Sequence, residues 1–176
     1  MIEFKFTESQ RQEAIREGTR RQSYNESRRL GGRNKAPERG RAAQDMHLLG
    51  AAAEVAVATY LGAEKYLFVD ESPVRGSCDI PGIDVKCRAR HYYDLLVQID
   101  DNLDKTFVLV TIENGKTYLH GFIEGFEVPT LGTIREFVPG RPCYAVPQSK
   151  LKPIEMLKNS YDPEERSREP METVWK

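Results

Sequence analysis

The chain has 176 residues, of which 39% are apolar and 30% charged, and its formal net charge is −1. This length and composition predict one domain with a modest hydrophobic core, and no apolar run approaches the roughly 18 residues of a membrane span. The three cysteines show no CxxC spacing, and the first residues lack the apolar centre of a signal peptide, so we expect a cytoplasmic protein with free thiols.

The N-terminal quarter is strongly basic and is predicted to be helical. From Thr7 to about Leu30 the sequence has no proline, but its apolar face is poor. Residues 11–41 hold ten basic and four acidic side chains, a net charge of +6. Such a segment favours contact with a phosphate backbone, and a solvated helix with i,i+4 ion pairs is the alternative. The residues assigned here to nucleic-acid contact are Arg20, Arg21, Arg28, Arg29, Arg33 and Lys35.

A second helix is predicted from Glu38 to Leu61, after a break at residues 31–37. Its middle is rich in alanine and glycine, which allows the backbone of a neighbouring element to come close. Glu54 lies in this apolar stretch, where a lone carboxylate is costly unless it is paired or binds a metal. His47, two turns earlier on the same face, is a candidate for phosphate or water contact, with a surface histidine as the alternative.

Beyond residue 62 the pattern changes to the period of two that is typical of strands. The predicted strands are residues 66–69, 76–80, 83–89, 95–99, 107–112, 117–123 and 143–146. Asn114-Gly115 predicts a tight hairpin turn, and a short helix is predicted at 149–157. The order of elements predicts the α/β or α+β class, with a mixed central β-sheet flanked by helices.

We expect three regions along the chain. They are a basic helical arm with a flexible loop (1–41), a core domain (42–157) and a polar C-terminal tail (158–176). Residues 11–41 have a net charge of +6, so the rest of the chain carries about −7. This division predicts that the core holds any catalytic site and that the arm meets a polyanion.

The octet DIPGIDVK at residues 79–86 carries the strongest chemical signal. The Pro-Gly pair predicts a turn that places Asp79 opposite Asp84, and two carboxylates about 5 Å apart repel each other unless a cation lies between them. Oxygen-only ligation suits Mg²⁺ or Mn²⁺. Lys86 shares a face with Asp84 and could orient a water or stabilise charge on a phosphate. The simpler alternative is a solvated hairpin in which Lys86 only pairs with Asp84.

Basic and aromatic side chains follow the octet and could contact a nucleic acid. The basic candidates are Arg88, Arg90, His91 and Lys105. Tyr92 and Tyr93 could stack on bases, with packing in the fold as the alternative. The acidic loop around Asp101 would repel DNA, so we expect the substrate to pass elsewhere.

These residues resemble the PD-(D/E)xK nuclease superfamily, whose pattern is a helix with Glu, then Asp, then (Asp/Glu)-x-Lys on a central hairpin. Glu54, Asp79 and Asp84-Val85-Lys86 match that pattern. The stretches HLLGAAAE (47–54) and YAVPQSKL (144–151) are similar to small phage-encoded members, and the resemblance covers about residues 45–155. One departure is Cys78, which stands where the family has proline.

The resemblance implies a restriction-endonuclease-like core and Mg²⁺- or Mn²⁺-dependent hydrolysis of DNA, by an endonuclease or an exonuclease of phage replication, recombination or repair. Asp79 and Asp84 would hold the metal, Glu54 would be a further ligand directly or through water, and Lys86 would orient the attacking water. DNA is the expected partner, and no membrane or organic cofactor is expected.

Two questions stay open at this point. A homodimer is compatible with the sequence, because cutting both strands of a duplex needs two sites. The alternative function is a non-catalytic nucleic-acid-binding or assembly protein that retains the nuclease fold. No helix-turn-helix or zinc module is recognisable, which favours structure-directed or weakly specific cleavage.

Overall fold

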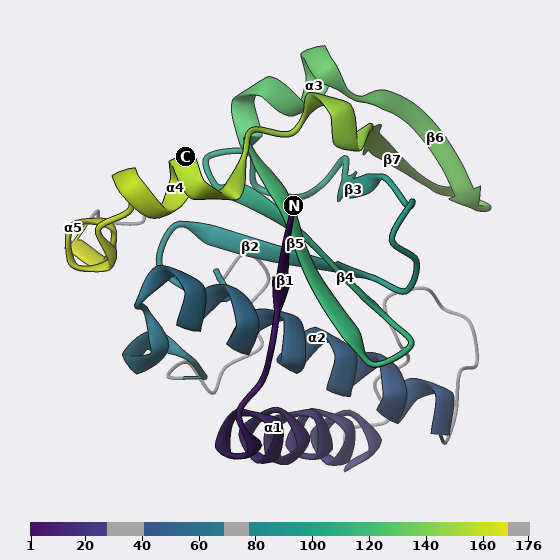
Figure 1. Ribbon diagram of the computed structural model, residues 1–176. Coiled ribbons are helices and arrows are strands. Elements are labelled where there is room, and N and C mark those ends of the chain that lie inside the picture. Colours follow the sequence, from purple (N-terminus) through teal and green to yellow (C-terminus); the bar gives the residue numbers. More distant parts are fainter. Residues whose placement is uncertain (28–40, 69–77, 169–176) are drawn as a thin grey trace.

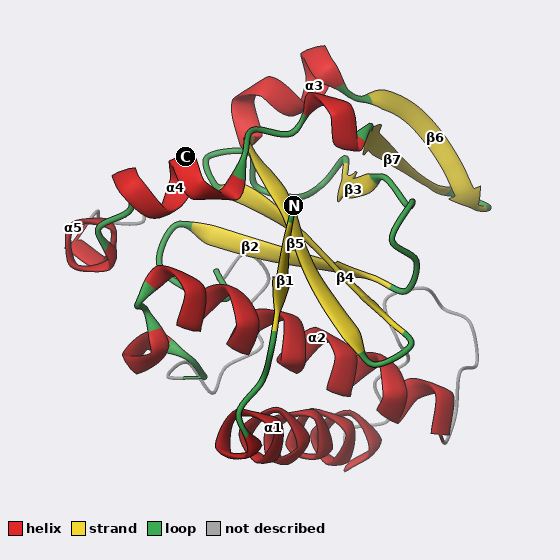
Figure 2. Cartoon of the chain, viewed as in Figure 1, coloured by secondary structure: helices red, strands yellow, loops and turns green. Residues whose placement is uncertain are grey.

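The computed structural model describes residues 1–27, 41–68 and 78–168, with the side chains of 25, 26 and 41–44 excepted. These residues form a mixed α+β fold with two β-sheets and five α-helices (Figures 1 and 2). None of the helices in these ranges combines the length and apolar character that crossing a membrane requires.

The larger sheet has the strand order β1-β5-β4-β2. Strands β1 (Ile2–Phe4) and β4 (Thr106–Glu113) pair antiparallel with β5 (Lys116–Glu124). Strand β2 (Ile83–Arg88) pairs parallel with β4, so the sheet is mixed and β2 forms one of its edges. The predicted mixed sheet is therefore confirmed.

Helices α1 (Glu8–Ser27) and α2 (Arg41–Leu61) cover one face of this sheet, with α2 next to the strands and α1 outside it (Figure 1). The core between α2 and the sheet is made by alanines and valines of α2 together with Ile83, Val108 and Leu119. Gly18 permits a close approach of the two helices, since a Cβ there would lie 2.7 Å from the Cα of Leu48.

The opposite face of the larger sheet packs against a three-stranded antiparallel sheet. Its order is β3 (Leu95–Gln98), β7 (Arg141–Val146) and β6 (Thr133–Val138). A second apolar cluster joins the layers and includes Leu95, Val97, Phe107 and Leu109. Helices α3 (Val128–Leu131), α4 (Ile154–Ser160) and α5 (Pro163–Arg168) complete the fold, with short 3₁₀ turns at Glu64–Tyr66, Gly125–Glu127 and Gln148–Lys150.

Several local predictions are confirmed and others are wrong. The left-handed φ angles of Asn114 (52°) and Gly115 (74°) form the expected hairpin turn, and Gly62 (72°) ends α2. The strand expected at 66–69 is wrong within the described residues, because residues 64–66 form a 3₁₀ turn and Phe68 has a φ of 58°. Strands β1 and β6 were not predicted. The described residues leave out 28–40, 69–77 and 169–176. The loop and the strand ends expected in these ranges therefore lie outside the described residues.

Candidate functional site

The predicted Pro-Gly turn forms at the start of β2. The N–H of Ile83 donates to the carbonyl of Ile80 at 2.9 Å, and Gly82 has a φ of 71°, as a type II turn requires. The N–H of Asp79 donates to the carbonyl of Ile83 at 3.0 Å. Asp79 therefore lies on the segment before the turn, and Asp84 on the segment after it. Within the described residues these two segments form a single β-bridge, between Ile80 and Ile83. These described segments do not continue as a hairpin, because β2 pairs with β4 instead.

Asp79, Asp84 and Glu54 act on one another electrostatically. The Asp79 carboxylate accepts the N–H of Val85 at 2.6 Å, which fixes it along β2. Burial, followed by the charges of Glu54 and Asp84, holds the pKa of Asp79 well above its ordinary value. Burial also raises the pKa of Glu54, with a smaller contribution from Asp84. The structure thus brings together the three carboxylates that the sequence singled out.

Arg21 of α1 reaches this cluster from the outer helix. Its two Nη atoms donate to the two carboxylate oxygens of Glu54 at 2.7 and 2.6 Å, and its Nε donates to Glu17 at 2.7 Å. Glu17 and Glu54 are both only 5% exposed. Glu17 also accepts from Arg20 at 2.7 and 2.9 Å. The Arg21–Glu54 pair therefore joins α1 to α2, and its bidentate geometry is the strong form of such a pair.

Lys86 is held between two carboxylates. Its Nζ lies 3.0 Å from Asp84 Oδ1 and 2.8 Å from Asp101 Oδ2, and 5.3 Å from the centre of the Phe107 ring. Burial acts to lower the pKa of Lys86, but Asp84 and Asp101 outweigh it and hold the pKa above its ordinary value. The side chain is therefore a fixed ammonium ion at neutral pH. Lys105 is also buried, with its Nζ 3.9 Å from Asp84 Oδ2.

The oxygen donors of this cluster match the chemistry of a hard divalent cation, but their present pairing opposes one. Carboxylate oxygens are the ligands that Mg²⁺ prefers. Burial is the main cause of the raised pKa of Asp79, and a cation would offset the repulsion that Glu54 and Asp84 add to it. Arg21 occupies both oxygens of Glu54, however, and no set of three or more Asp, Glu, His or Cys side chains in the described ranges is arranged to hold a metal. Asp79 and Asp84 are the carboxylates of this cluster that could take a cation, since neither is held by an arginine among the described residues.

The residues predicted to contact nucleic acid lie in different environments. The guanidinium groups of Arg20 and Arg21 are engaged with Glu17, and that of Arg21 also with Glu54. His47 is half-buried on α2, where burial and the charge of Arg21 lower its pKa. Arg88 lies at the end of β2. The remaining four, Arg28, Arg29, Arg33 and Lys35, lie outside the described residues.

Sequence reasoning missed the roles of Arg21 and Asp101 in the site. Arg21 lies 33 residues before Glu54, and Asp101 lies 15 residues after Lys86. Neither separation follows a helical or strand period, so no pattern in the sequence could link these residues to their partners. Asp101 belongs to the acidic loop expected to repel DNA, and the structure places its carboxylate on Lys86.

The three cysteines are free, as expected. Cys78 and Cys87 are half-buried and Cys143 is buried. Burial raises the pKa of all three thiols, that of Cys87 to about 12. A thiol with a raised pKa is a weak nucleophile at neutral pH, so the cysteines do not supply the chemistry of this site.

Comparisons with known proteins identify no relative. No protein-family model matches the chain, and no curated protein or solved structure matches it either. A function is therefore inferred from the residues of this site and from the geometry that surrounds them.

Proposed function

We propose that the protein is a metal-dependent deoxyribonuclease that hydrolyses DNA phosphodiester bonds. The observation that carries the proposal is the mutual repulsion of Glu54, Asp79 and Asp84, together with the pairing of Asp84 with Lys86. The raised pKa values of Asp79 and Glu54 mean that the folded protein keeps these groups ionised only at a cost. Charges held together at such a cost are typical of catalytic and metal-binding sites.

The finer fold assignment is part of this proposal. We propose that α2, β2 and β4 form a restriction-endonuclease-like core of the PD-(D/E)xK type. Support comes from the Glu on the helix, the Asp before the Pro-Gly turn and the Asp-x-Lys of β2, which occur in the order of that pattern. A setting in phage DNA replication, recombination or repair, within the host cytoplasm, rests on the same resemblance.

Each side chain has a distinct role in the proposed reaction. Asp79 and Asp84 would hold Mg²⁺ or Mn²⁺, and Glu54 would bind through a water molecule. When bound, such a cation lowers the pKa of a coordinated water and neutralises charge on the phosphate oxygens. Lys86, which Asp101 holds at 2.8 Å, would orient the attacking water and stabilise the charge that develops on the phosphate.

One observation favours the second candidate, a non-catalytic nucleic-acid-binding or assembly protein that keeps the nuclease fold. Arg21 takes both oxygens of Glu54, and Lys86 takes an oxygen of Asp84. In such a protein these ion pairs would be permanent and would replace a metal. In the nuclease, by contrast, Asp84 would exchange its contact with Lys86 for a cation.

A cleavage assay separates the two candidates. Labelled linear duplex, single strand, flap and four-way junction DNA would be incubated with wild type, Asp84→Asn and Lys86→Met, in Mg²⁺, Mn²⁺ or EDTA. Asp100→Asn, an exposed carboxylate of the neighbouring loop, is the matched control. We expect metal-dependent cutting by wild type and by the control, and at least a roughly 100-fold lower rate in the two site variants. DNA binding without cutting of any substrate would favour the non-catalytic candidate.

A further inference from the structure

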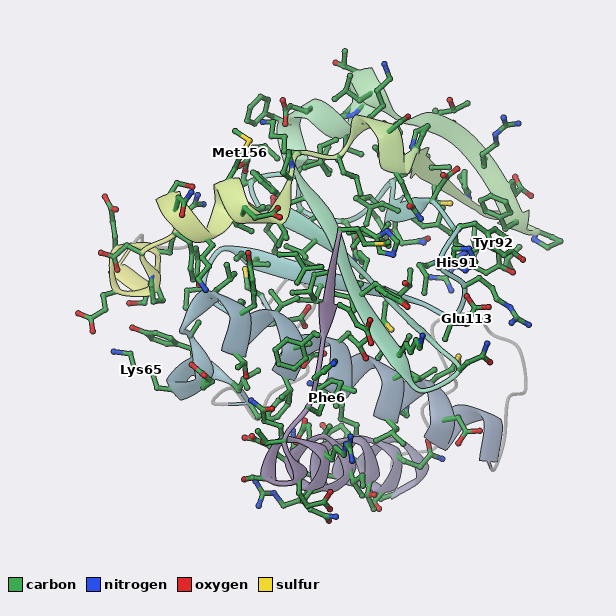
Figure 3. All side chains as sticks on the ribbon, in the orientation of Figure 1. Phe6, Lys65, His91, Tyr92, Glu113 and Met156 are labelled. Carbon is green, nitrogen blue, oxygen red and sulfur yellow. The ribbon has the colours of Figure 1, made fainter. Side chains whose placement is uncertain are left out.

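A short loop of aromatic residues directly follows β2, the strand that carries Asp84 and Lys86. In this loop Tyr92 is 63% exposed and Tyr93 is 37% exposed. The rings of His91 and Tyr92 meet edge to face at 5.4 Å between centroids, and those of Tyr92 and Tyr93 at 5.0 Å. Figure 3 shows His91 and Tyr92 projecting together, close to Glu113. Adjoining aromatic rings with this much exposed surface are typical of a binding surface.

Two anchors hold the backbone of this loop in place. Glu113 accepts hydrogen bonds from the His91 N–H at 3.0 Å and from Arg90 Nη1 at 2.9 Å. Hydrogen bonds from His91 and Arg90 lower the pKa of Glu113 to about 2, so it stays ionised. On the other side, Gln148 Nε2 donates to the carbonyls of His91 and Tyr93 at 2.6 and 2.8 Å. The rings are therefore exposed on a backbone that is already fixed, which lowers the entropy cost of binding.

Positive charge connects the aromatic loop to the proposed catalytic residues. Arg88 is two residues beyond Lys86 on β2, hence on the same face and about 7 Å along the strand. Its guanidinium carbon lies 5.0 Å from the centre of the Tyr93 ring. Its Nε is buried and has no hydrogen-bond partner in the described part of the chain. A buried N–H without a partner is unusual in a protein, and the half-buried Arg88 side chain leaves one positive charge beside the rings for a phosphate.

We propose that residues 90–93, together with Arg88, bind a single-stranded segment of DNA next to the cleavage site. The inference rests on the proposed nuclease function and names the form of its substrate. Exposed rings beside an arginine recognise unpaired bases, because each base offers a face for stacking, whereas the bases of a duplex are already stacked on one another. The substrate is then a single strand, or a junction or flap that contains one.

The test measures DNA binding in EDTA, where no cleavage interferes. Fluorescence anisotropy would compare a labelled single strand with a duplex of the same length, for wild type, Tyr92→Ala and Tyr92→Phe. Phe137→Ala is the matched control, because Phe137 is a 64% exposed aromatic residue on β6. We expect Tyr92→Ala to weaken single-strand binding about 10-fold and to change duplex binding by less than about 2-fold. Tyr92→Phe and Phe137→Ala should each change single-strand binding by less than about 2-fold.

Two results would overturn the inference. One is a single-strand affinity that Tyr92→Ala leaves unchanged, and the other is an equal loss in Phe137→Ala. A parallel cleavage assay in Mn²⁺ distinguishes a failure of this inference from a failure of the proposed function. If duplex DNA is still cut while Tyr92→Ala leaves single-strand binding unchanged, the inferred single-strand site is wrong and the proposed nuclease function is retained. If wild type neither binds nor cuts any DNA, both proposals are wrong.

Discussion

At the scale of single residues, Asp79 shows the conflict between folding and the proposed chemistry most clearly. Its carboxylate is desolvated by burial, accepts the Val85 N–H and lies in the field of two other carboxylates, Glu54 and Asp84. The folded protein therefore disfavours the ionised form relative to the unfolded chain. An uncharged residue of the same shape would suit the fold better but could not hold a cation.

Asp79→Asn is expected to raise the free energy of unfolding in EDTA by about 1 kcal/mol at pH 8. The asparagine keeps an acceptor for the Val85 N–H and cannot ionise. Because the pKa of Asp79 is raised from an ordinary value of 3.8, wild type loses stability as the pH rises from that value through the raised pKa. Urea denaturation between pH 4 and pH 8 would measure the difference, which should grow with pH. A difference independent of pH would contradict the explanation.

At the scale of elements, the contact between α1 and α2 organises the site. Gly18 lets the helix backbones approach, and Arg21 then reaches Glu54 with two hydrogen bonds of 2.7 and 2.6 Å. Arg21 is a positioning residue, because it fixes the orientation of Glu54 beside the two aspartates. Removing one partner of such a pair leaves a buried charge uncompensated.

Arg21→Met is expected to destabilise the protein by about 3 kcal/mol. The double variant Arg21→Met/Glu54→Gln should recover part of this loss, because it removes the buried charge as well. Arg20→Met is the matched control: its side chain is 44% exposed where it pairs with Glu17, so we expect a cost below about 1 kcal/mol. Chemical denaturation of wild type, Arg21→Met, Glu54→Gln and the double variant completes a double-mutant cycle, which gives the coupling energy. Strict additivity would show that Arg21 and Glu54 do not stabilise each other.

Local chemistry explains which elements could be predicted from the sequence. The second helix and the Asn114-Gly115 turn follow from periodicity and from residues that accept a positive φ. Strand β6 was not predicted, because five of its six residues are exposed. The alternation of apolar and polar residues that indicates a strand is therefore missing. The parallel pairing of β2 with β4 depends on tertiary packing, since nothing local to residues 83–88 specifies a partner that begins at Thr106.

At the scale of the whole molecule, the site is assembled from distant parts of the chain. Arg21 comes from α1, Glu54 from α2, Asp79 to Lys86 from the edge of the larger sheet, and Asp101 from the connection after β3. The four residues of the nuclease pattern could be found in the sequence because a known spacing links three of them. Arg21 and Asp101 could not, because only the folded chain brings them there. The described part of the basic segment, through residue 27, is thus packed into the fold.

The charge of residues 11–41 still predicts contact with DNA, through the basic side chains beyond α1. Replacing Arg28, Arg29, Arg33 and Lys35 with glutamine should weaken binding to duplex and single strand alike. The slope of log K against log salt concentration should fall by about 1 for each phosphate that the variant no longer neutralises. Titrations at several salt concentrations measure this slope, with Lys150→Gln/Lys158→Gln as the control. An unchanged slope would mean that these four side chains do not contact the DNA backbone.

The most direct test of the proposed metal site is a calorimetric titration of Mn²⁺ into the protein without DNA. Wild type and Asp100→Asn are predicted to bind the metal, whereas Asp79→Asn and Asp84→Asn are predicted to lose binding by at least about 10-fold. Saturation at about 100 times Kd should also raise the free energy of unfolding of wild type by about 2.7 kcal/mol. Binding that is absent from wild type, or that both aspartate variants retain, would contradict the metal site and with it the proposed nuclease.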